Sequence, residues 1–297
     1  MTNNIWSKKL QGILTLDLSR EIRFRDDQKD AIIEMLRLKP EMTIADIGCG
    51  PGAITRKLAS WLGAKTRIIG IDRDTNFINY AQAQAEKKSI KNICYLEGDA
   101  LDLPLPDNSV DACLSYTVIE HIPNREFLLE QKRVCKNNGI VSVMLSRPDK
   151  YIKSEPANIP KITAGEIELW AKLNQGMMDI NQKYNVGQYW PAEDELPSLY
   201  TSLGFENIRI DALAVPIAID DARNSPEAKI RLIEIEKQQA LERVEMLTGS
   251  ATSTEKKELQ MLIADRFATR LDLLKNNKKI WDYTVIIIQA VSGVVKK

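Results

Sequence analysis

The chain has 297 residues, of which 44% are apolar and 28% are charged. These proportions are ordinary for a globular protein with enough chain to bury a core, and they exclude disordered and collagen-like chains. Lysine plus arginine and aspartate plus glutamate both number 41, so no net charge attracts polyanions. Nucleic acid is therefore disfavoured as a partner, although a local basic patch is compatible with a neutral total.

The cysteine and histidine content disfavours both a metal centre and a disulfide framework. The four cysteines are far apart in the sequence, and His121 is the single histidine. The first twenty residues lack the apolar core of a signal peptide, and the apolar run 283–291 is too short to cross a bilayer. We therefore expect a cytoplasmic protein with no membrane partner and no metal.

Strands and helices alternate between residues 25 and 146. Apolar residues at helical spacing predict helices over 25–40, 53–63, 75–88 and 124–137. Short β-branched runs predict strands over 42–48, 66–72, 92–99, 109–116 and 139–146. This alternation predicts an α/β fold, a Rossmann-like doubly wound sheet of mostly parallel strands with helices on both faces.

Two segments interrupt this alternation within a single expected domain, 1–297. Residues 147–191 carry several aromatic side chains and follow the fifth strand, at the edge where open α/β sheets bind ligands, so they form a candidate substrate lid. Residues 225–277 predict a helical hairpin, whose second helix starts at a capping box of Thr252 and Glu255. The expected parts are an N-terminal helical segment 1–40, a cofactor-binding core 41–146, the lid 147–191, and a C-terminal part 192–297 that contains the hairpin.

The stretch "ADIGCGPGAIT", residues 45–55, follows the first strand and contains the spacing G-x-G-x-x-A. Glycines let a ligand approach the backbone between a strand and a helix, as dinucleotide-binding proteins require. Asp46, however, would repel a pyrophosphate, whereas it would attract the sulfonium and ammonium of S-adenosylmethionine. Asp72 ends the second strand, and Asp99 ends the third, where its carboxylate could accept a hydrogen bond from an adenine amino group. A nicotinamide-dependent oxidoreductase stays the alternative, because the glycine spacing alone permits it.

Over residues 30–205 the chain resembles class I S-adenosylmethionine-dependent methyltransferases of the small-molecule, type 11-like kind. The resemblance rests on "ADIGCGPG", "GIDRD", "EGDALDLPLPDNSVDACLSYTVIEHIPN" and "RVCKNNGIVSV". It implies that S-adenosylmethionine is the cofactor and S-adenosylhomocysteine the product, and that an antiparallel hairpin of residues 205–215 and 281–291 ends the sheet around the inserted helices. It further implies that Gly48 and Gly50 cradle the methionine part, Asp72 holds the ribose hydroxyls, and Arg73 lies against the adenine beside Asp99 and Ala100. The full candidate cofactor-binding set is Asp46, Gly48, Cys49, Gly50, Gly52, Asp72, Arg73, Asp99, Ala100, Tyr116 and Thr117.

Methyl transfer from a sulfonium has a good leaving group, so positioning and exclusion of water can supply much of the rate enhancement. If the acceptor must lose a proton, His121 is the only imidazole near the end of the fourth strand, and it is the candidate catalytic residue. The alternative is a hydrogen-bonded histidine that orients the loop. The candidate substrate residues are Tyr151, Tyr184, Tyr189 and Trp190, which could instead pack a lid helix against the sheet.

Three functions compete on this sequence. The first is a methyltransferase for a small-molecule acceptor, because the chain offers a pocket-sized lid and no charged tail. The second keeps the cofactor but methylates a protein or RNA, with the hairpin as the docking surface. The third is a non-catalytic nucleotide-binding protein of the same fold. The sequence leaves open the acceptor atom, the use of a base and the oligomeric state, for which a homodimer is one option.

Overall fold

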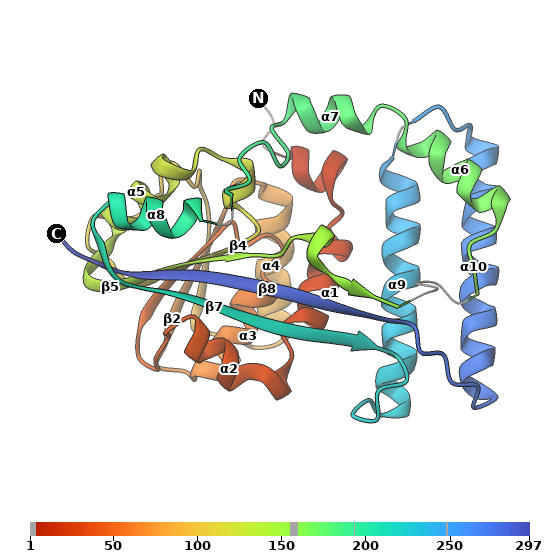
Figure 1. Cartoon of the computed structure of the whole chain (residues 1–297), viewed down its shortest axis with the longest axis horizontal. Coiled ribbons are helices and arrows are strands. Elements are labelled where there is room, and N and C mark those ends of the chain that lie inside the picture. The colour runs from red at the N-terminus through yellow and green to blue at the C-terminus, as the bar shows by residue number, and fades with distance from the viewer. Residues whose placement is uncertain (1–3, 155–159, 193, 248) are drawn as a thin grey trace.

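The computed structural model describes residues 4–154, 160–192, 194–247 and 249–297 (Figure 1). Parts of three predicted segments lie outside the described residues: 1–3 of the N-terminal segment, 155–159 of the lid, and Glu193 and Thr248 of the C-terminal part, the latter within the hairpin.

Within the described residues, eight strands form one sheet in the order β3-β2-β1-β4-β5-β8, and β6 and β7 both pair with β8. Neighbouring strands from β3 to β5 are parallel, whereas β8 runs antiparallel to β5, β6 and β7. The strand order reverses between β1 and β4, which opens a crevice at the carboxyl ends of these strands. The predicted mostly parallel sheet with an antiparallel end is therefore confirmed. The strands are β1 (Thr43–Ile47), β2 (Arg67–Asp72), β3 (Ile93–Glu97), β4 (Val110–Tyr116), β5 (Cys135–Leu145), β6 (Ile152–Lys153), β7 (Phe205–Ala218) and β8 (Tyr283–Val295).

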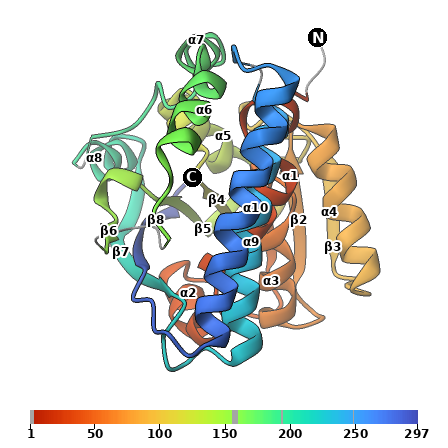
Figure 2. The same ribbon diagram turned by 90° about the vertical axis from the view of Figure 1, so that its right-hand side faces the viewer.

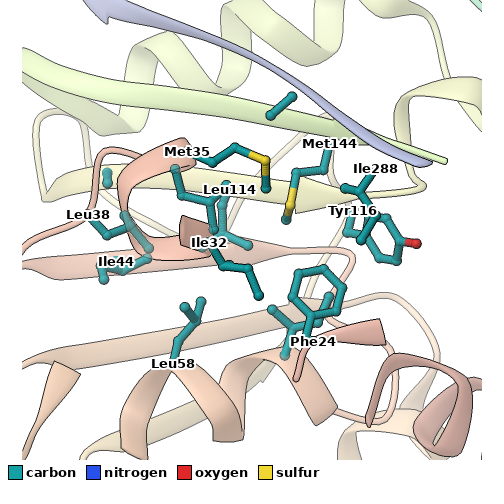
Figure 3. Packing of buried hydrophobic residues seen from close by; sticks show 14 of the residues in the cluster. Phe24, Ile32, Met35, Leu38, Ile44, Leu58, Leu114, Tyr116, Met144 and Ile288 are labelled. Atoms are coloured by element: carbon teal, nitrogen blue, oxygen red, sulfur yellow. The ribbon is translucent and has the colours of Figure 1, made fainter. Parts of the chain in front are cut away.

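Each face of the sheet buries its own apolar cluster, because side chains along a strand alternate between faces. Ile44 and Leu114 point to the face covered by α1 (Ile13–Arg23), α2 (Lys29–Met35) and α3 (Ala53–Leu62), where Phe24, Ile32 and Leu58 complete the packing (Figure 3). The opposite face packs against α5 (Asn124–Val134) and α8 (Glu195–Ser202). The helix predicted over 124–137 is too long, since Cys135 already pairs with Val110 as the start of β5. The remaining elements of the core are η2 (Asp26–Gln28), α4 (Thr75–Lys87), η3 (Ile119–His121) and η4 (Pro148–Lys150).

The N-terminal segment folds back over the carboxyl edge of the sheet through one carboxylate. Asp74 is fully buried and caps α4, where it accepts a hydrogen bond from the Asn76 N–H at 3.0 Å. The same side chain accepts hydrogen bonds from the N–H and the hydroxyl of Ser7, at 2.8 and 2.9 Å. Asp74 therefore holds the π-helix η1 (Trp6–Leu10) beside the start of α4.

The predicted hairpin consists of α9 (Pro226–Met246) and α10 (Ser253–Lys275), which lie side by side at one end of the sheet (Figures 1 and 2). The capping box of Thr252 and Glu255 is present, as predicted. The lid contains two helices, α6 (Ala164–Asn174) and α7 (Met177–Lys183). Helix α6 lies beside the hairpin and joins it in a third apolar cluster, and α7 lies along the top of the molecule in Figure 1. The hairpin is therefore packed into the fold together with the lid.

Helix α1 receives its N-terminal cap from the hairpin. Gly12 at the N-cap position has no side chain, and the first N–H groups of a helix need an acceptor. Glu242 of α9 supplies it, because its two carboxylate oxygens accept hydrogen bonds from the N–H groups of Leu14 and Thr15, at 3.0 and 2.6 Å. This contact fixes the start of α1 against α9.

We expect Glu242→Ala to lower the free energy of unfolding by about 1–2 kcal/mol, the usual cost of losing a helix cap. Urea unfolding followed by circular dichroism measures this difference. Glu234→Ala is the matched control, because Glu234 is an exposed carboxylate on the same helix. Equal stabilities of the two variants would contradict the capping role.

Candidate functional site

A cavity opens at the carboxyl ends of β1, β2, β3 and β4, and we call it the inner cavity. It brings together eleven of the predicted site residues: Asp46, Gly48, Cys49, Gly50, Asp72, Arg73, Asp99, Ala100, Tyr116, Thr117 and His121. Gly52 does not line the cavity; it is the N-cap residue of α3, and its carbonyl oxygen lies 3.5 Å from the hydroxyl of Tyr95. Parallel strands explain this convergence, because their carboxyl ends meet at one edge of the sheet.

The glycine turn is fixed to the neighbouring strand through its backbone. The N–H groups of Gly48 and Cys49 both donate to the carbonyl oxygen of Ile71, at 2.8 and 3.0 Å. The N–H of Gly50 donates to Asp72 Oδ2 at 2.8 Å, and the other oxygen of Asp72 accepts from the Asp74 N–H at 2.9 Å. Asp72 therefore shapes the turn as well as facing the cavity.

Two carboxyl groups of the inner cavity hold protons more strongly than ordinary aspartates. Burial raises the pKa of Asp46 to about 7, although a hydrogen bond of 2.5 Å from the Thr55 hydroxyl opposes this shift. Burial likewise raises the pKa of Asp72 to about 6, against the two backbone hydrogen bonds that it accepts. A raised carboxyl pKa means that the negative charge lacks compensation here, so a bound cation would stabilise the ionised form.

Asp99 and Ala100 follow β3 at the far side of the cavity. Asp99 Oδ1 accepts a hydrogen bond from the Leu101 N–H at 2.9 Å, and both residues line the inner cavity. Three carboxyl groups thus border the cavity. Asp46 lies near the end of β1, Asp72 ends β2, and Asp99 follows β3.

A strained residue follows the end of β4, and it contacts Arg20 of α1, which the sequence analysis missed. Thr117 has φ of +54°, which is uncommon for a β-branched residue and is found where function or packing demands it. Its hydroxyl accepts a hydrogen bond of 2.9 Å from Arg20, which also lies 5.3 Å from the ring centroid of Tyr116. Burial, with the neighbouring charge of Arg23, lowers the pKa of Arg20 to about 10, so the guanidinium stays charged at neutral pH. Arg20 thus brings a positive charge to a cavity rich in carboxyl groups.

Trp6 covers the cavity from the N-terminal segment and was also missed. Its ring lies 4.7 Å from that of His121, centroid to centroid, and the Arg73 guanidinium lies 6.0 Å from its ring centroid. The Gly187 N–H donates to His121 Nδ1 at 2.9 Å, which leaves the proton of the neutral imidazole on Nε2. Burial, together with the charges of Arg73 and Arg20, lowers the pKa of His121 to about 4. His121 is therefore neutral at pH 7, and its acceptor nitrogen is engaged.

Glu120 and Cys49 are buried groups beside the same loops. Burial raises the pKa of Glu120 to about 7, and its Oε2 atom has no hydrogen-bond partner within the described residues. Glu120 lines neither this cavity nor the second one described below. Burial raises the pKa of the Cys49 thiol, so this residue is a poor nucleophile.

The four candidate substrate residues do not line the inner cavity. The Tyr151 hydroxyl hydrogen-bonds Ser146 Oγ at 2.7 Å, and Tyr184 lies under the ammonium of Lys183. The Tyr189 N–H donates to the Glu120 carbonyl oxygen at 3.0 Å, and Trp190 packs against the cluster beneath α5 and α8. Their positions favour the alternative of lid packing.

A second cavity, which we call the outer cavity, adjoins the first. Its volume is about 700 Å³, and it lies between η1, the lid helices α6 and α7, and the hairpin. Trp6, Gln11 and His121 line both cavities, so the two meet at these side chains. From the lid, Trp170 and Met177 line the outer cavity, and the N-terminal segment supplies part of its wall.

No group of three or more histidine, cysteine, aspartate or glutamate side chains within the described residues could hold a metal ion. No helix in the described part of the chain combines the length and apolar character needed to cross a membrane.

A glycine turn and an acid-bordered cavity at the switch point are typical of α/β proteins that bind nucleotides or nucleosides. The protein family described as "Methyltransferase domain" matches residues 45–143. The chain is 26% identical to a demethylmenaquinone methyltransferase of Desulfitobacterium hafniense, over 61% of this chain and 73% of that protein. It is 32% identical to a sterol 24-C-methyltransferase of Gibberella zeae, over 36% of this chain and 28% of that protein.

Among solved structures, a phosphoethanolamine N-methyltransferase 2 of Haemonchus contortus in complex with S-adenosylmethionine is similar over 100% of this chain and 60% of that chain. The TM-score is 0.58 at 17% identity, so the likeness concerns the fold. Residues 45–143 are therefore a methyltransferase domain. The chain is an enzyme, a methyltransferase that uses S-adenosylmethionine.

Proposed function

We propose that this methyltransferase acts on a small-molecule acceptor. The observation that carries the proposal is the outer cavity of about 700 Å³, which meets the inner cavity at Trp6, Gln11 and His121. Its volume lies within the range of about 300–1,000 Å³ common for small-ligand sites. Relatives named for demethylmenaquinone and for a sterol support the same class of acceptor.

The residues of the inner cavity fit the parts of S-adenosylmethionine in a definite order. Asp72 would accept hydrogen bonds from the ribose hydroxyls, and Asp99 with Ala100 would border the adenine. Asp46 would face the cationic methionine part, and Arg20 would pair with its carboxylate. A Cβ atom on Gly50 would meet no atom within 4 Å, so the turn leaves open space on the cavity side for the ligand.

When bound, S-adenosylmethionine supplies an electrophilic methyl carbon whose bond to sulfur breaks with the electron pair left on sulfur. The chain contributes position and exclusion of water. Thr117 and Arg20 are held to each other by a hydrogen bond of 2.9 Å, and Trp6 packs on His121 where the cavities meet. Fixed side chains of this kind lower the entropic cost of bringing the two reactants together.

His121 is better suited to hold Trp6 in place between the two cavities than to remove a proton from the acceptor. Its Nδ1 lone pair accepts the Gly187 N–H, and its lowered pKa of about 4 makes it a weak base. We expect His121→Gln to raise KM for the acceptor while the shape of the pH profile of kcat stays unchanged. Loss of an ionisation from that profile in the variant would establish His121 as the base instead.

The affinity for S-adenosylmethionine should fall on acidification. With pKa values of about 7 and about 6, Asp46 and Asp72 are both ionised at pH 8, whereas at pH 6 Asp46 is largely protonated and Asp72 is about half protonated. A neutral carboxyl does not attract a cation. Binding therefore becomes weaker as pH falls. Protonation of Asp46, whose pKa is about 7, weakens binding by about tenfold between pH 8 and pH 6. Calorimetry at both pH values measures the change. Asp46→Asn should flatten the dependence, and an affinity that is constant from pH 6 to pH 8 would refute the assignment.

The class of acceptor is tested with methyl-labelled S-adenosylmethionine and a cell extract. After incubation with the enzyme, the extract is separated by size, and label is counted in small molecules, protein and RNA. We expect enzyme-dependent label in the small-molecule fraction together with S-adenosylhomocysteine. Label confined to protein or RNA would overturn the proposal and favour a macromolecular acceptor.

A further inference from the structure

The outer cavity combines apolar surface with positive charge. Its apolar lining comes from three separate elements: Trp170 of α6, Met177 of α7, and Met246 with Leu247 at the end of α9. Flexible methionines beside an aromatic ring form an adaptable surface for a flat or chain-like apolar group. This part of the lining suits an organic body that water solvates poorly.

The charged lining of the outer cavity has one sign. It contains Lys9, Arg243 and Arg266, and no aspartate or glutamate is among the described residues that line it. Arg266 is already neutralised, because it binds the buried carboxylate of Glu166 through two hydrogen bonds of 2.9 and 3.0 Å. Any net positive charge therefore comes from Lys9 and Arg243.

Arg243 is held in place by uncharged partners. One guanidinium nitrogen donates to the amide oxygen of Asn174 at 2.8 Å, and the guanidinium carbon lies 5.6 Å from the ring centroid of Trp170. Within the described residues, Arg243 forms no ion pair with a carboxylate. A guanidinium that is oriented but not neutralised is suited to bind a carboxylate, sulfonate or phosphate.

We propose that the outer cavity binds the methyl acceptor as an amphipathic anion. This inference rests on the proposed function, since it names the chemistry of the acceptor. The apolar body lies against Trp170, Met177 and Leu247, and the anionic group lies at Arg243 with Lys9 nearby. The group to be methylated then reaches the inner cavity at the junction of Trp6 and His121, where the two cavities meet.

Two fluorescent dyes with the same ring system test this inference. 1-Anilinonaphthalene-8-sulfonate carries a sulfonate, and N-phenyl-1-naphthylamine lacks it. We expect Arg243→Met to weaken binding of the sulfonate dye by about tenfold, because a charge-assisted contact is lost. The neutral dye should bind this variant within about twofold of the parent protein, because its apolar contacts remain. Arg243→Lys should restore part of the sulfonate affinity.

The matched control is Arg231→Met, which removes an exposed arginine of the same helix α9 outside the cavity. It should leave both dyes unaffected. Calorimetry with S-adenosylhomocysteine on each variant reports whether the inner cavity stays intact. Equal loss of both dyes in Arg243→Met, or an unchanged sulfonate affinity, would overturn the inference.

The outcomes also separate this inference from the proposed function. The parent protein could bind S-adenosylhomocysteine and label small molecules while Arg243→Met leaves the affinity for the sulfonate dye unchanged. The inference of an anionic acceptor is then wrong, and the small-molecule activity stands. If label appears only in macromolecules, the proposed function itself fails, whatever the dyes show.

Discussion

Asp72→Ala is expected to weaken binding of S-adenosylhomocysteine by roughly 10- to 150-fold, which corresponds to a loss of about 1.5–3 kcal/mol for a hydrogen bond to a charged group. The substitution removes the carboxylate that would accept the ribose hydroxyls. It also leaves the N–H groups of Gly50 and Asp74 without their acceptor, because Asp72 binds them at 2.8 and 2.9 Å. Calorimetry measures the affinity.

Two further ligands and variants locate this effect on the ribose. Adenosine carries the ribose but not the methionine part, so its affinity should fall by a similar factor in Asp72→Ala. Asp72→Asn keeps one oxygen acceptor and should show a smaller loss. Glu126→Ala, an exposed carboxylate of α5, is the control and should bind as the parent does. If Asp72→Ala binds adenosine as tightly as the parent protein, Asp72 does not hold the ribose.

The cofactor side of the site was predictable because its signals are local. Each strand is a short β-branched run, and in a parallel sheet the residues after such strands converge on one edge. Asp46, Asp72 and Asp99 were therefore placed together from their positions alone, and all three line the inner cavity. Gly52, which lies between the second and third positions of the glycine motif, was less informative, since it is the N-cap residue of α3 and lies outside the cavity lining.

The residues that cover the site could not be predicted, because contacts between residues far apart in the sequence hold them there. Trp6 depends on the hydrogen bonds between Ser7 and Asp74, 67 residues apart. Arg20 reaches Thr117 across 97 residues. Trp6 is an isolated tryptophan and Arg20 is one arginine in a helix, and no local spacing pattern predicts their distant partners.

The lid shows the same limit in another form. Its aromatic content predicted a ligand surface, but composition does not say which way a side chain points. The structure directs Trp170 toward the outer cavity, whereas Trp190 packs on the sheet cluster. The hairpin was predicted with its capping box, yet its contacts with α1 through Glu242 required the folded chain.

Gly48→Ala is expected to lower the stability of the fold, and Gly50→Ala is expected to lower the affinity for the cofactor. Both residues have positive φ, +68° and +54°. A left-handed conformation costs an alanine about 1–2 kcal/mol at either position. At Gly48 the new Cβ would also lie 2.4 Å from Val118 Cγ2, and such overlap adds about 1–3 kcal/mol. We therefore expect Gly48→Ala to lose about 2–5 kcal/mol of unfolding free energy in urea, the sum of these two costs.

Gly50→Ala should remain folded and lose the cofactor. No atom lies within 4 Å of its added Cβ, so the methyl group meets open space where the ligand would approach the turn. We expect at least about tenfold weaker binding of S-adenosylhomocysteine, because one buried methyl group displaces contacts along the ligand. Gly63→Ala is the matched control: φ is +83°, the space is equally open, and the residue ends α3 outside the cavity lining. Because Gly63→Ala carries backbone strain without blocking the turn, equal affinities of the two variants would show that the cofactor does not approach Gly50.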